Sequence, residues 1–285
     1  GLPLELLRVG PADATWEALV VAGLDGRRHR VEQQLALDVA ARLAESPDDL
    51  PPGCAFLFVV DANPDATAAF ERFPRHGNDT AVDEDGDGAR DEDGPDDLDG
   101  DGVLSWMRVP DPTGAWSFGD DGVPVRADPP KGRARTHRIV PEGRDDDGDG
   151  AWSEDGPGGV DLSRNFTWRF EEHTRGAGDW PASEPETRAL LDLLLGDERI
   201  ALVYEIGGHE TVSKAPGWGG AWQKPPDEDV ALQDALRELH GKGAGETHPE
   251  RAPGAGSLGA TVWHQLGRVW FGRSPLGASG PAWPE

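Results

Sequence analysis

Short runs of apolar residues alternate with a stretch of helical periodicity near the start of the chain. Two continuous apolar runs, residues 18–22 and 55–60, are typical of strands buried on both faces of a sheet, and residues 200–206 are expected to form a third core strand. Between the first two runs, residues 31–45 have the spacing of an amphipathic helix with the apolar stripe Val31, Leu35, Val39 and Leu43. The order strand, helix, strand predicts two parallel neighbours joined by a crossover helix.

The remainder of the chain predicts three further elements. A helix is expected over residues 184–195, where Ser183 and Glu186 have the spacing of a capping box. A second amphipathic helix is expected over residues 227–240, and a last strand over residues 262–271. Together these elements predict an α/β fold with a mixed, mostly parallel sheet flanked by helices.

One long region does not follow this pattern. Residues 78–159 are rich in Gly, Pro and Asp and show little periodicity. We therefore expect a single domain over residues 1–285, interrupted by an irregular acidic insertion over residues 78–159. The eleven Trp of the chain lie mostly in loops or in its last third, where they either pack the insertion onto the core or form a platform for a glycan or peptide.

Charge narrows the range of partners. The chain has 285 residues, with 54 acidic against 27 basic side chains and a formal net charge of -27. Such a charge repels phosphate backbones, so no nucleic acid is expected as a partner. No apolar run approaches the roughly 18 to 20 residues that a membrane span needs. The single cysteine, Cys54, excludes an intramolecular disulfide.

The acidic residues gather in two windows of the insertion, 83–102 and 142–155, which hold 18 of the 54 acids. Three times in these windows, Asp occupies alternate positions and Gly follows: Asp83, Asp85 and Asp87 before Gly88, Asp97, Asp99 and Asp101 before Gly102, and Asp145, Asp147 and Asp149 before Gly150. Asp91, Asp93 and Asp155 are further candidate ligands at later positions of the first and third loops.

This spacing predicts several structural calcium ions. Calcium binds six to eight oxygen ligands, and such a loop offers them at positions 1, 3 and 5, with a glycine at position 6 that permits the sharp turn. The loops lack the glutamate at position 12 of an EF-hand and resemble thrombospondin type 3 repeats or dockerins more closely. Because millimolar calcium is normal outside cells, we expect an extracellular or cell-surface setting. A salt-adapted acidic domain that binds monovalent ions weakly is the alternative.

Three ordered motifs carry a resemblance to a known family. Residues 159–166 read GVDLSRNF, residues 183–188 read SEPETR, and Asn63, Pro64 and Asp65 follow the second predicted strand. In this order they are similar to the zinc carboxypeptidases of the carboxypeptidase A-like family. The resemblance covers most of the chain outside the insertion and implies a mixed sheet flanked by helices.

That family holds a zinc ion with the His and Glu of an HxxE turn and with a second, distant His, which leaves one position for water. By the resemblance, Asp25 stands where the first His belongs, Arg28 where the Glu belongs, and Glu205 where the second His belongs. We expect these three residues to converge on a vacated zinc site, with Arg28 in place of the metal charge.

Other parts of the catalytic set are also absent. The family has a general-base Glu on its last strand, but no Asp or Glu lies between Glu250 and Glu285. Arg164, which matches the carboxylate-clamping Arg of the family, either binds a carboxylate such as a peptide C-terminus or pairs with Asp161. Zinc is therefore not expected, and the predicted function is a catalytically inactive, calcium-stabilised binding or structural protein.

The expected partner is a second copy of the chain or an extracellular peptide or glycan. The alternative is an active zinc carboxypeptidase that removes C-terminal residues from peptides with a shifted ligand set, His29, Glu32 and His209. The first two of these match HxxE one turn further along the chain.

Overall fold

The protein is described here from a computed structural model. The structure describes residues 2–26, 29–70, 75–83, 88, 90–91, 94–146, 148, 152, 159–207, 227, 230–231, 234–235, 238, 257–266 and 269–273. At residues 29, 260, 263–264 and 269–273 it describes the backbone but not the side chains. The chain divides into two compact units, one formed by residues 1–70, 74–80 and 160–285 and the other by residues 71–73 and 81–159.

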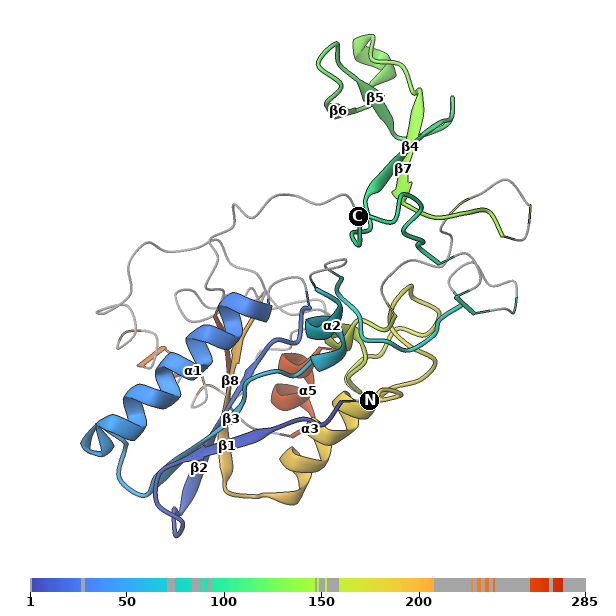
Figure 1. The fold of residues 1–285 in the computed structure, drawn as a ribbon. Coiled ribbons are helices and arrows are strands. Elements are labelled where there is room, and N and C mark those ends of the chain that lie inside the picture. Colours follow the sequence, from blue (N-terminus) through green and yellow to red (C-terminus); the bar gives the residue numbers. More distant parts are fainter. Residues whose placement is uncertain are drawn as a thin grey trace. The chain divides into compact units, whose positions relative to one another are not determined.

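The first unit is built on a five-stranded mixed sheet in the order β1-β3-β2-β8-β9 (Figure 1). Strands β2, β3, β8 and β9 are parallel, and β1 runs antiparallel to β3 at one edge. The strands are β1 Leu6–Val9, β2 Trp16–Ala22, β3 Cys54–Val59, β8 Ile200–Ile206 and β9 Val269–Arg273. The helices are α1 His29–Glu45, α2 Pro64–Ala69, α3 Pro185–Gly196 and α5 Leu258–His264, with short 3-10 turns η1 Pro47–Asp49 and η3 Leu162–Arg164.

The predicted crossover unit is confirmed, since β2 and β3 are parallel neighbours joined by α1. The buried stripe of α1 differs from the predicted one: Val31 is 45% exposed, whereas Glu32, Ala36 and Ala40 are buried. Leu35, Val39 and Leu43 are partly buried and pack against the apolar cluster between α1 and the sheet. Alanine at two successive turns allows the helix backbone to approach the sheet closely, which periodicity alone does not reveal.

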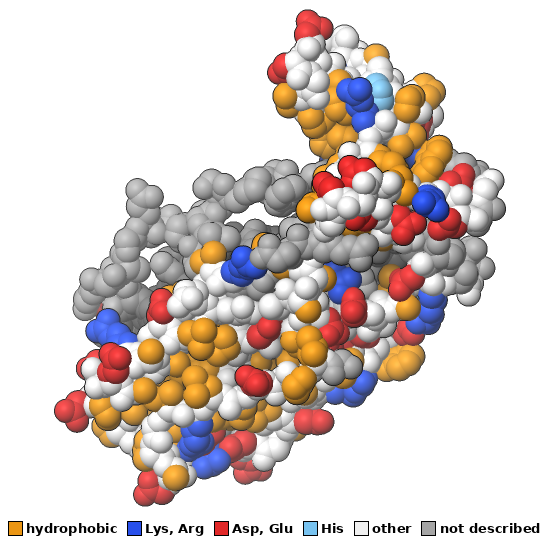
Figure 2. Space-filling view, viewed as in Figure 1, with side chains coloured by type: hydrophobic (Ala, Val, Ile, Leu, Met, Phe, Trp, Pro, Cys, Tyr) orange, Lys and Arg blue, Asp and Glu red, His pale blue; other side chains and the backbone are white. Residues whose placement is uncertain are grey.

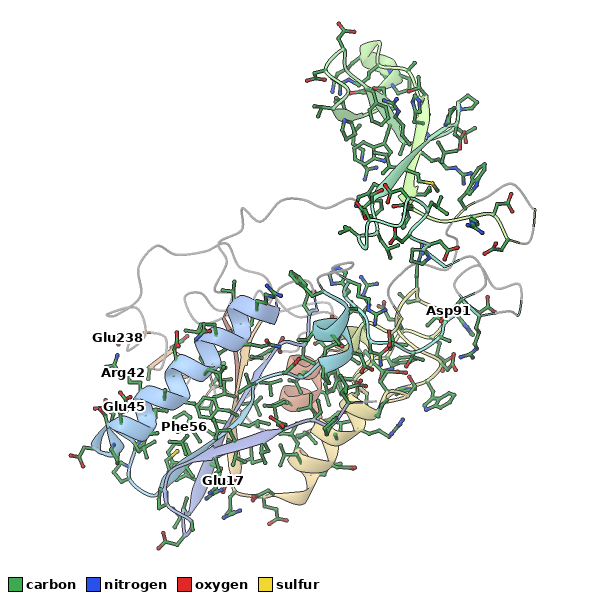
Figure 3. All side chains as sticks on the ribbon, viewed as in Figure 1. Glu17, Arg42, Glu45, Phe56, Asp91 and Glu238 are labelled. Carbon is green, nitrogen blue, oxygen red and sulfur yellow. The ribbon has the colours of Figure 1, made fainter. Side chains whose placement is uncertain are left out.

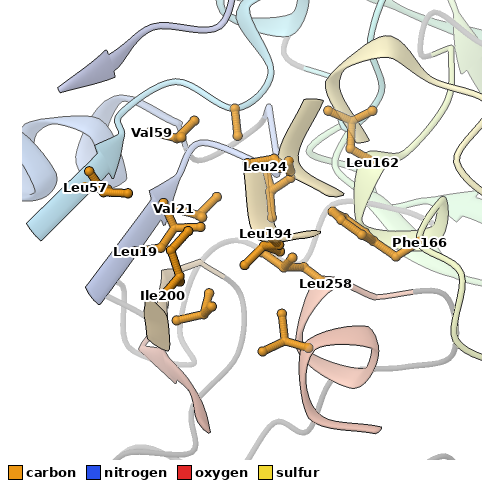
Figure 4. Packing of buried hydrophobic residues seen from close by; sticks show 14 residues of the cluster. Leu19, Val21, Leu24, Leu57, Val59, Leu162, Phe166, Leu194, Ile200 and Leu258 are labelled. Carbon is orange, nitrogen blue, oxygen red and sulfur yellow. The ribbon is translucent and has the colours of Figure 1, made fainter. Parts of the chain in front are cut away.

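Two apolar clusters sandwich the sheet. The larger joins β2, β3 and β8 to α3 and α5 (Figure 4) and consists of Leu19, Val21, Leu24, Leu57, Val59, Ala62, Leu162, Phe166, Leu190, Leu194, Ile200, Val203, Leu258 and Val262. The smaller lies under α1 and includes Val20, Phe58 and Ile206. Because the residues of each strand alternate between the two clusters, the sheet is buried on both faces, as the continuous apolar runs predict.

Near the carboxyl terminus the prediction of one strand over residues 262–271 is wrong. Residues 258–264 form α5, and the strand β9 begins only at Val269. Apolar residues occur in both elements, so a short run without clear periodicity could not separate a buried helical turn from a strand. The described residues between 227 and 238 are helical, in agreement with the helix predicted there. No helix in the described part of the chain is long and apolar enough to cross a membrane.

The second unit contains a four-stranded antiparallel sheet in the order β4-β7-β5-β6. Its elements are β4 Trp106–Pro110, β5 Trp116–Phe118, β6 Pro124–Arg126, the 3-10 turn η2 Pro129–Lys131 and β7 His137–Pro141. Leu104 is the sole buried hydrophobic residue among those described between 81 and 159. The described part of this unit therefore has almost no apolar core of its own.

A charged cluster joins the start of β2 to the segment before β8. Glu17 is fully buried near the start of β2 (Figure 3) and forms ion pairs with Arg8 and with Arg199 at 3.2 Å. Arg199 also holds Asp197 through two hydrogen bonds, at 2.9 and 2.6 Å. This bidentate contact lowers the pKa of the Asp197 carboxyl to about 2.

Replacement of Asp197 with Asn should therefore destabilise the protein in a pH-dependent way. The folded-state pKa lies below the value of about 3.9 for an unfolded Asp. Its stabilisation is thus complete above about pH 4 and is lost as the pH falls toward 2. Because the pair is partly exposed, we expect a loss of about 1 kcal/mol at pH 7. Urea unfolding of the wild-type and variant proteins between pH 7 and pH 2.5 measures this loss, with Asp48→Asn as the charge-matched control. If the difference in unfolding free energy between wild type and Asp197→Asn did not change with pH, the low pKa of Asp197 would not be its cause.

Candidate functional site

The carboxyl ends of β3, β2 and β8 lie side by side, because these three strands are parallel neighbours in the sheet. The segments that leave these ends carry polar residues, among them Asp25 after β2 and Asp61 and Asn63 after β3. Ligands of open α/β sheets bind at this edge. The edge therefore defines the first candidate site.

Asp25, which the sequence motifs led us to expect at a vacated zinc site, forms a pair with His76. Oδ1 of Asp25 lies 2.8 Å from Nδ1 of His76, and both side chains are partly exposed. A carboxylate bound to Nδ1 fixes the orientation of the imidazole and directs Nε2 away from the pair. His76 was missed at the sequence level because it lies 51 positions from Asp25 and belongs to no spacing motif.

Asn63 connects the loops around this pair. Its side chain is fully buried, and Oδ1 accepts a hydrogen bond from the amide of Ala66, which caps α2. Its Nδ2 group donates to the carbonyl of Leu24 at 3.4 Å and to that of His76 at 3.1 Å. Gly26 completes the contact, because a Cβ there would lie 2.4 Å from the carbonyl oxygen of Arg75.

Two buried carboxylates lie close to the same edge. Glu205 in β8 is 3% exposed and lies two residues after Val203, so both side chains are on the face packed by α3 and α5. Glu32 in the first turns of α1 is fully buried, and its Oε2 accepts a hydrogen bond from the amide of Gly23 at 3.2 Å. Thus α1 carries a carboxylate back to the end of β2.

Several predicted residues cannot be placed at this edge. Arg28, His209 and the side chain of His29 lie outside the described residues, so the convergence of Asp25, Arg28 and Glu205 remains a prediction. The same holds for the alternative zinc set, of which Glu32 alone is described in full.

The family-like motifs form a buried hydrogen-bond network. Asn165, from GVDLSRNF, is fully buried; its Oδ1 accepts from the amide of Glu184, and its Nδ2 donates to the carbonyl of Ala177 at 2.8 Å and to Oγ of Ser183 at 2.9 Å. Two of its partners belong to SEPETR, so the two motifs contact each other directly. Their role here is to hold loops together.

Asn78 extends this network toward the amino end of α3. Its Oδ1 accepts from the amide of Val160, and its Nδ2 donates to Glu184 at 2.7 Å and to Glu186 at 3.3 Å. Burial raises the pKa of the Glu186 carboxyl, and the charges of Asp65 and Glu184 act in the same direction.

The predicted capping box at α3 is wrong. Glu184, not Ser183, is the N-cap, and it makes no side-chain capping bond. The hydroxyl of Ser183 instead donates to Glu184, and Glu186 is held by Asn78. The Ser183 hydroxyl also accepts a hydrogen bond from Asn165, so both groups bond to distant side chains and not to the helix end.

Arg164 pairs with Asp161, which is one of the two roles that the sequence left open for it. Its Nε lies 3.4 Å from Oδ2 of Asp161, and its Nη1 donates to the carbonyl of Arg175 at 3.4 Å. The side chain is 53% exposed, so this ion pair is weak and leaves the guanidinium accessible to a ligand. Binding of a carboxylate remains untested.

The second candidate site is the acidic loop around Asp97. Oδ1 of Asp97 accepts from the amides of Gly100 and Asp101, and Oδ2 accepts from that of Gly102 at 2.8 Å. Gly102 has φ +86, a left-handed conformation that glycine adopts without strain, and it lies at position 6, where a sharp turn was expected. One oxygen each of Asp97, Asp99 and Glu142 lie within 4.8 Å of one another.

Glu142 was not predicted to join this loop. It is 5% exposed, and its carboxylate accepts four hydrogen bonds, from the amides of Leu98, Asp99 and Ser105 and from the Ser105 hydroxyl. The bonds from Ser105 are the main cause that lowers the pKa of the Glu142 carboxyl, which therefore keeps its charge at neutral pH. Sequence spacing could not indicate this residue, because it lies over 40 positions from the loop.

The other two loops share parts of this geometry. Oδ2 of Asp83 accepts from the amide of Gly88 at 3.0 Å, as Asp97 does from Gly102. Oδ1 of Asp145 accepts from the amide of Gly148 at 2.7 Å, and Asp91 accepts from the amide of Val82. The remaining predicted ligands lie outside the described residues: Asp85, Asp87, Asp93, Asp147, Asp149 and Asp155.

Comparison with known proteins bears on the fold. No protein-family model and no curated protein matches the sequence. Among solved structures, carboxypeptidase A from Helicoverpa armigera is similar over 99% of this chain and 58% of its own, with a TM-score of 0.54 and 13% identity. Bovine thrombin-activatable fibrinolysis inhibitor, in complex with tick carboxypeptidase inhibitor, is similar over 95% of this chain and 74% of its own, with a TM-score of 0.50 and 12% identity.

A second structure of thrombin-activatable fibrinolysis inhibitor gives the same picture, with a TM-score of 0.50, 12% identity and coverage of 95% of this chain and 57% of that one. The chain thus spans little more than half the length of two of these proteins. At such identities the likeness concerns the fold alone. The chain has a carboxypeptidase-like α/β fold, as the three motifs predicted.

Proposed function

We propose that this chain is a carboxypeptidase-like domain that has no peptidase activity, is stabilised by calcium and serves in binding or architecture outside the cell. The pair formed by Asp25 and His76 supports the absence of peptidase activity. Where the family needs a neutral imidazole as zinc ligand, this chain has a carboxylate whose Oδ1 is already held by an imidazole at 2.8 Å.

The residues at this edge do not fit a zinc site of the family type. A catalytic zinc ion in such a site is bound by two imidazoles and one carboxylate. Here the matching positions are Asp25, Arg28 and Glu205, which offer two carboxylates and a cation. A guanidinium repels a metal ion, and Arg28 would satisfy two carboxylates in its place. No catalytic step through zinc is therefore derived for this chain.

Calcium binding is supported by the loop around Asp97. Its carboxylates supply oxygen ligands only, which suits a hard cation, and three of them already lie within 4.8 Å of one another. Asp83 and Asp145 also accept hydrogen bonds from glycine amides of their own loops. This shared geometry supports calcium binding by all three loops. Since the surrounding unit has almost no apolar core, bound ions would supply the missing stability.

Self-association is supported by the edge strand β1. It pairs with β3 on one side only among the described residues, and it carries Leu6 and Leu7, which are 49% and 42% exposed. An edge strand with exposed leucines favours pairing with another chain. A second copy is therefore one of the proposed partners.

One observation favours the active enzyme as the second candidate. Glu32 is fully buried and bonded to the amide of Gly23, directly after β2. In the shifted frame it would be the carboxylate ligand, with His29 and His209 as the imidazoles. Burial of a carboxylate at the strand end is what such a ligand set requires.

Metal content separates the two candidates. The protein is dialysed against trace zinc and millimolar calcium, and bound metals are measured by plasma mass spectrometry. We expect several calcium ions and no zinc per chain, together with no release of C-terminal residues from a peptide mixture. About one zinc per chain, lost in Glu32→Gln but retained in the control Glu45→Gln, would establish the shifted ligand set instead.

A further inference from the structure

One face of the sheet β4-β7-β5-β6 has an unusual composition for so acidic a chain. Strand register places Trp106, Arg108 and Pro110 of β4 on the same face as His137, Ile139 and Pro141 of β7, Trp116 and Phe118 of β5, and Pro124 and Arg126 of β6. We call these ten residues the aromatic–arginine face. It contains no Asp, Glu or Lys.

The arginines of this face are held by aromatic rings. The guanidinium of Arg108 lies 4.7 Å from the ring centroid of Phe118, and that of Arg126 lies 5.1 Å from that of Trp116. His137 meets the edge of Phe118 at 4.9 Å. A guanidinium stacked on a ring is oriented in advance and loses little freedom when it binds an anion.

These positive charges are not neutralised locally. Among the described residues, neither Arg108 nor Arg126 forms an ion pair, whereas Arg138 on the opposite face pairs with Asp111 at 3.0 Å. Residues 104–141 hold six Lys or Arg against four Asp, in a chain with twice as many acids as bases. Arg108 and Arg126 are exposed, and Trp106 is 43% exposed.

Figure 2 shows hydrophobic side chains beside basic ones and a histidine on the visible side of this unit, with acidic side chains elsewhere on the same side. The composition of the aromatic–arginine face matches the centre of a protein–protein interface, which is enriched in aromatic residues and Arg and depleted in Lys, Asp and Glu. Proline and isoleucine offer apolar contact area that a hydroxyl-rich sugar would not use well. The surplus of positive charge adds complementarity to an acidic partner.

We propose that the aromatic–arginine face binds an acidic protein segment in which carboxylates alternate with apolar residues. The carboxylates would accept paired hydrogen bonds from Arg108 and Arg126, and the apolar residues would cover Trp106 and Ile139. This surface belongs to the β4–β7 unit, so the inference does not depend on whether the carboxypeptidase-like unit is active.

The probe is a synthetic twelve-residue peptide of alternating Glu and Leu, titrated into the full chain in saturating calcium at about 0.15 M salt, which screens long-range repulsion by the net negative charge of the chain. We expect binding in the range of about 10 to 100 µM. Arg108→Gln and Arg126→Gln should each weaken it about 5- to 10-fold, because each removes a charge-assisted pair. Lys131→Gln is the control, since this side chain is 83% exposed in η2 and pairs with Asp128; it should change binding less than 2-fold.

Five outcomes would overturn the proposal. The first is no binding, and the second is equal losses in Lys131→Gln and Arg126→Gln, which would show a response to net charge alone. The third is a sulfated oligosaccharide of equal charge that binds as tightly and responds to the same variants, which would assign the face to glycans. The fourth is a dimer in sedimentation velocity that Arg126→Gln abolishes, which would make a second copy the occupant. Protection of β4 amides from hydrogen exchange by the peptide would support the proposed location, and unchanged exchange would exclude it.

Discussion

Chelation of calcium should lower the melting temperature of this protein by about 10 to 20 °C. Each ion present at 100 times its dissociation constant stabilises the folded state by about 2.7 kcal/mol. Two such ions give the stated shift in a protein of this size. The physical reason is the lack of a core, since Leu104 is the sole buried hydrophobic residue described between 81 and 159. Differential scanning calorimetry with calcium and with a chelator measures the shift.

A matched pair of variants tests whether the loop around Asp97 is responsible. Asp99→Asn keeps the shape of a residue whose oxygen lies in the proposed calcium site and removes its charge. Asp120→Asn removes the same charge from an exposed residue outside the loops. We expect the first to reduce calcium affinity at least tenfold and the second to leave it unchanged. A chelator without effect, or equal responses of the two variants, would favour a salt-adapted acidic domain.

Replacement of Asn165 with Ala should cost about 2 to 4 kcal/mol of unfolding free energy. The change leaves the amide of Glu184, the carbonyl of Ala177 and the hydroxyl of Ser183 without this partner in a fully buried position. Buried groups that lose their hydrogen bonds cost about 1 to 3 kcal/mol each unless the structure relaxes. Urea unfolding in saturating calcium provides the measurement.

Ser163→Ala is the control for this variant, because Ser163 belongs to the same motif. Its hydroxyl bonds to the nearby Asp161 in a partly buried position, so the loss should stay below about 1 kcal/mol. If both variants had the same small effect, the motif would not be the structural network described above. A large difference would show that GVDLSRNF and SEPETR have a structural role in this chain, independent of any zinc site.

The central strands could be predicted from the sequence because they are mostly local apolar runs bounded by turn residues, as Cys54–Val59 illustrates. The exposed position of Val31 could not, since it depends on how closely α1 approaches the sheet. The short strands β4 to β7 were missed because they bury little and so lack the alternation that marks a half-buried sheet.

For the sites, the sequence indicated which carboxylates matter but not what they contact. Asp25 was singled out as a replaced ligand, yet its partner His76 comes from a loop 51 positions away. Likewise, Asp97 and Asp99 were identified by their spacing, whereas Glu142 joins them from another segment. Pairings of this kind arise from tertiary structure, and one sequence without relatives carries no signal for them.

Cys54, the first residue of β3, has a practical consequence for how the lifetime of this fold can be observed. It is the sole thiol of the chain, it is fully buried, and its burial raises the pKa of the thiol to about 11. Reagents attack the thiolate, so alkylation in neutral buffer has to wait until the sheet opens. The rate of alkylation of Cys54 therefore reports opening events around β3 in the carboxypeptidase-like unit, separately from any loss of order in the acidic loops.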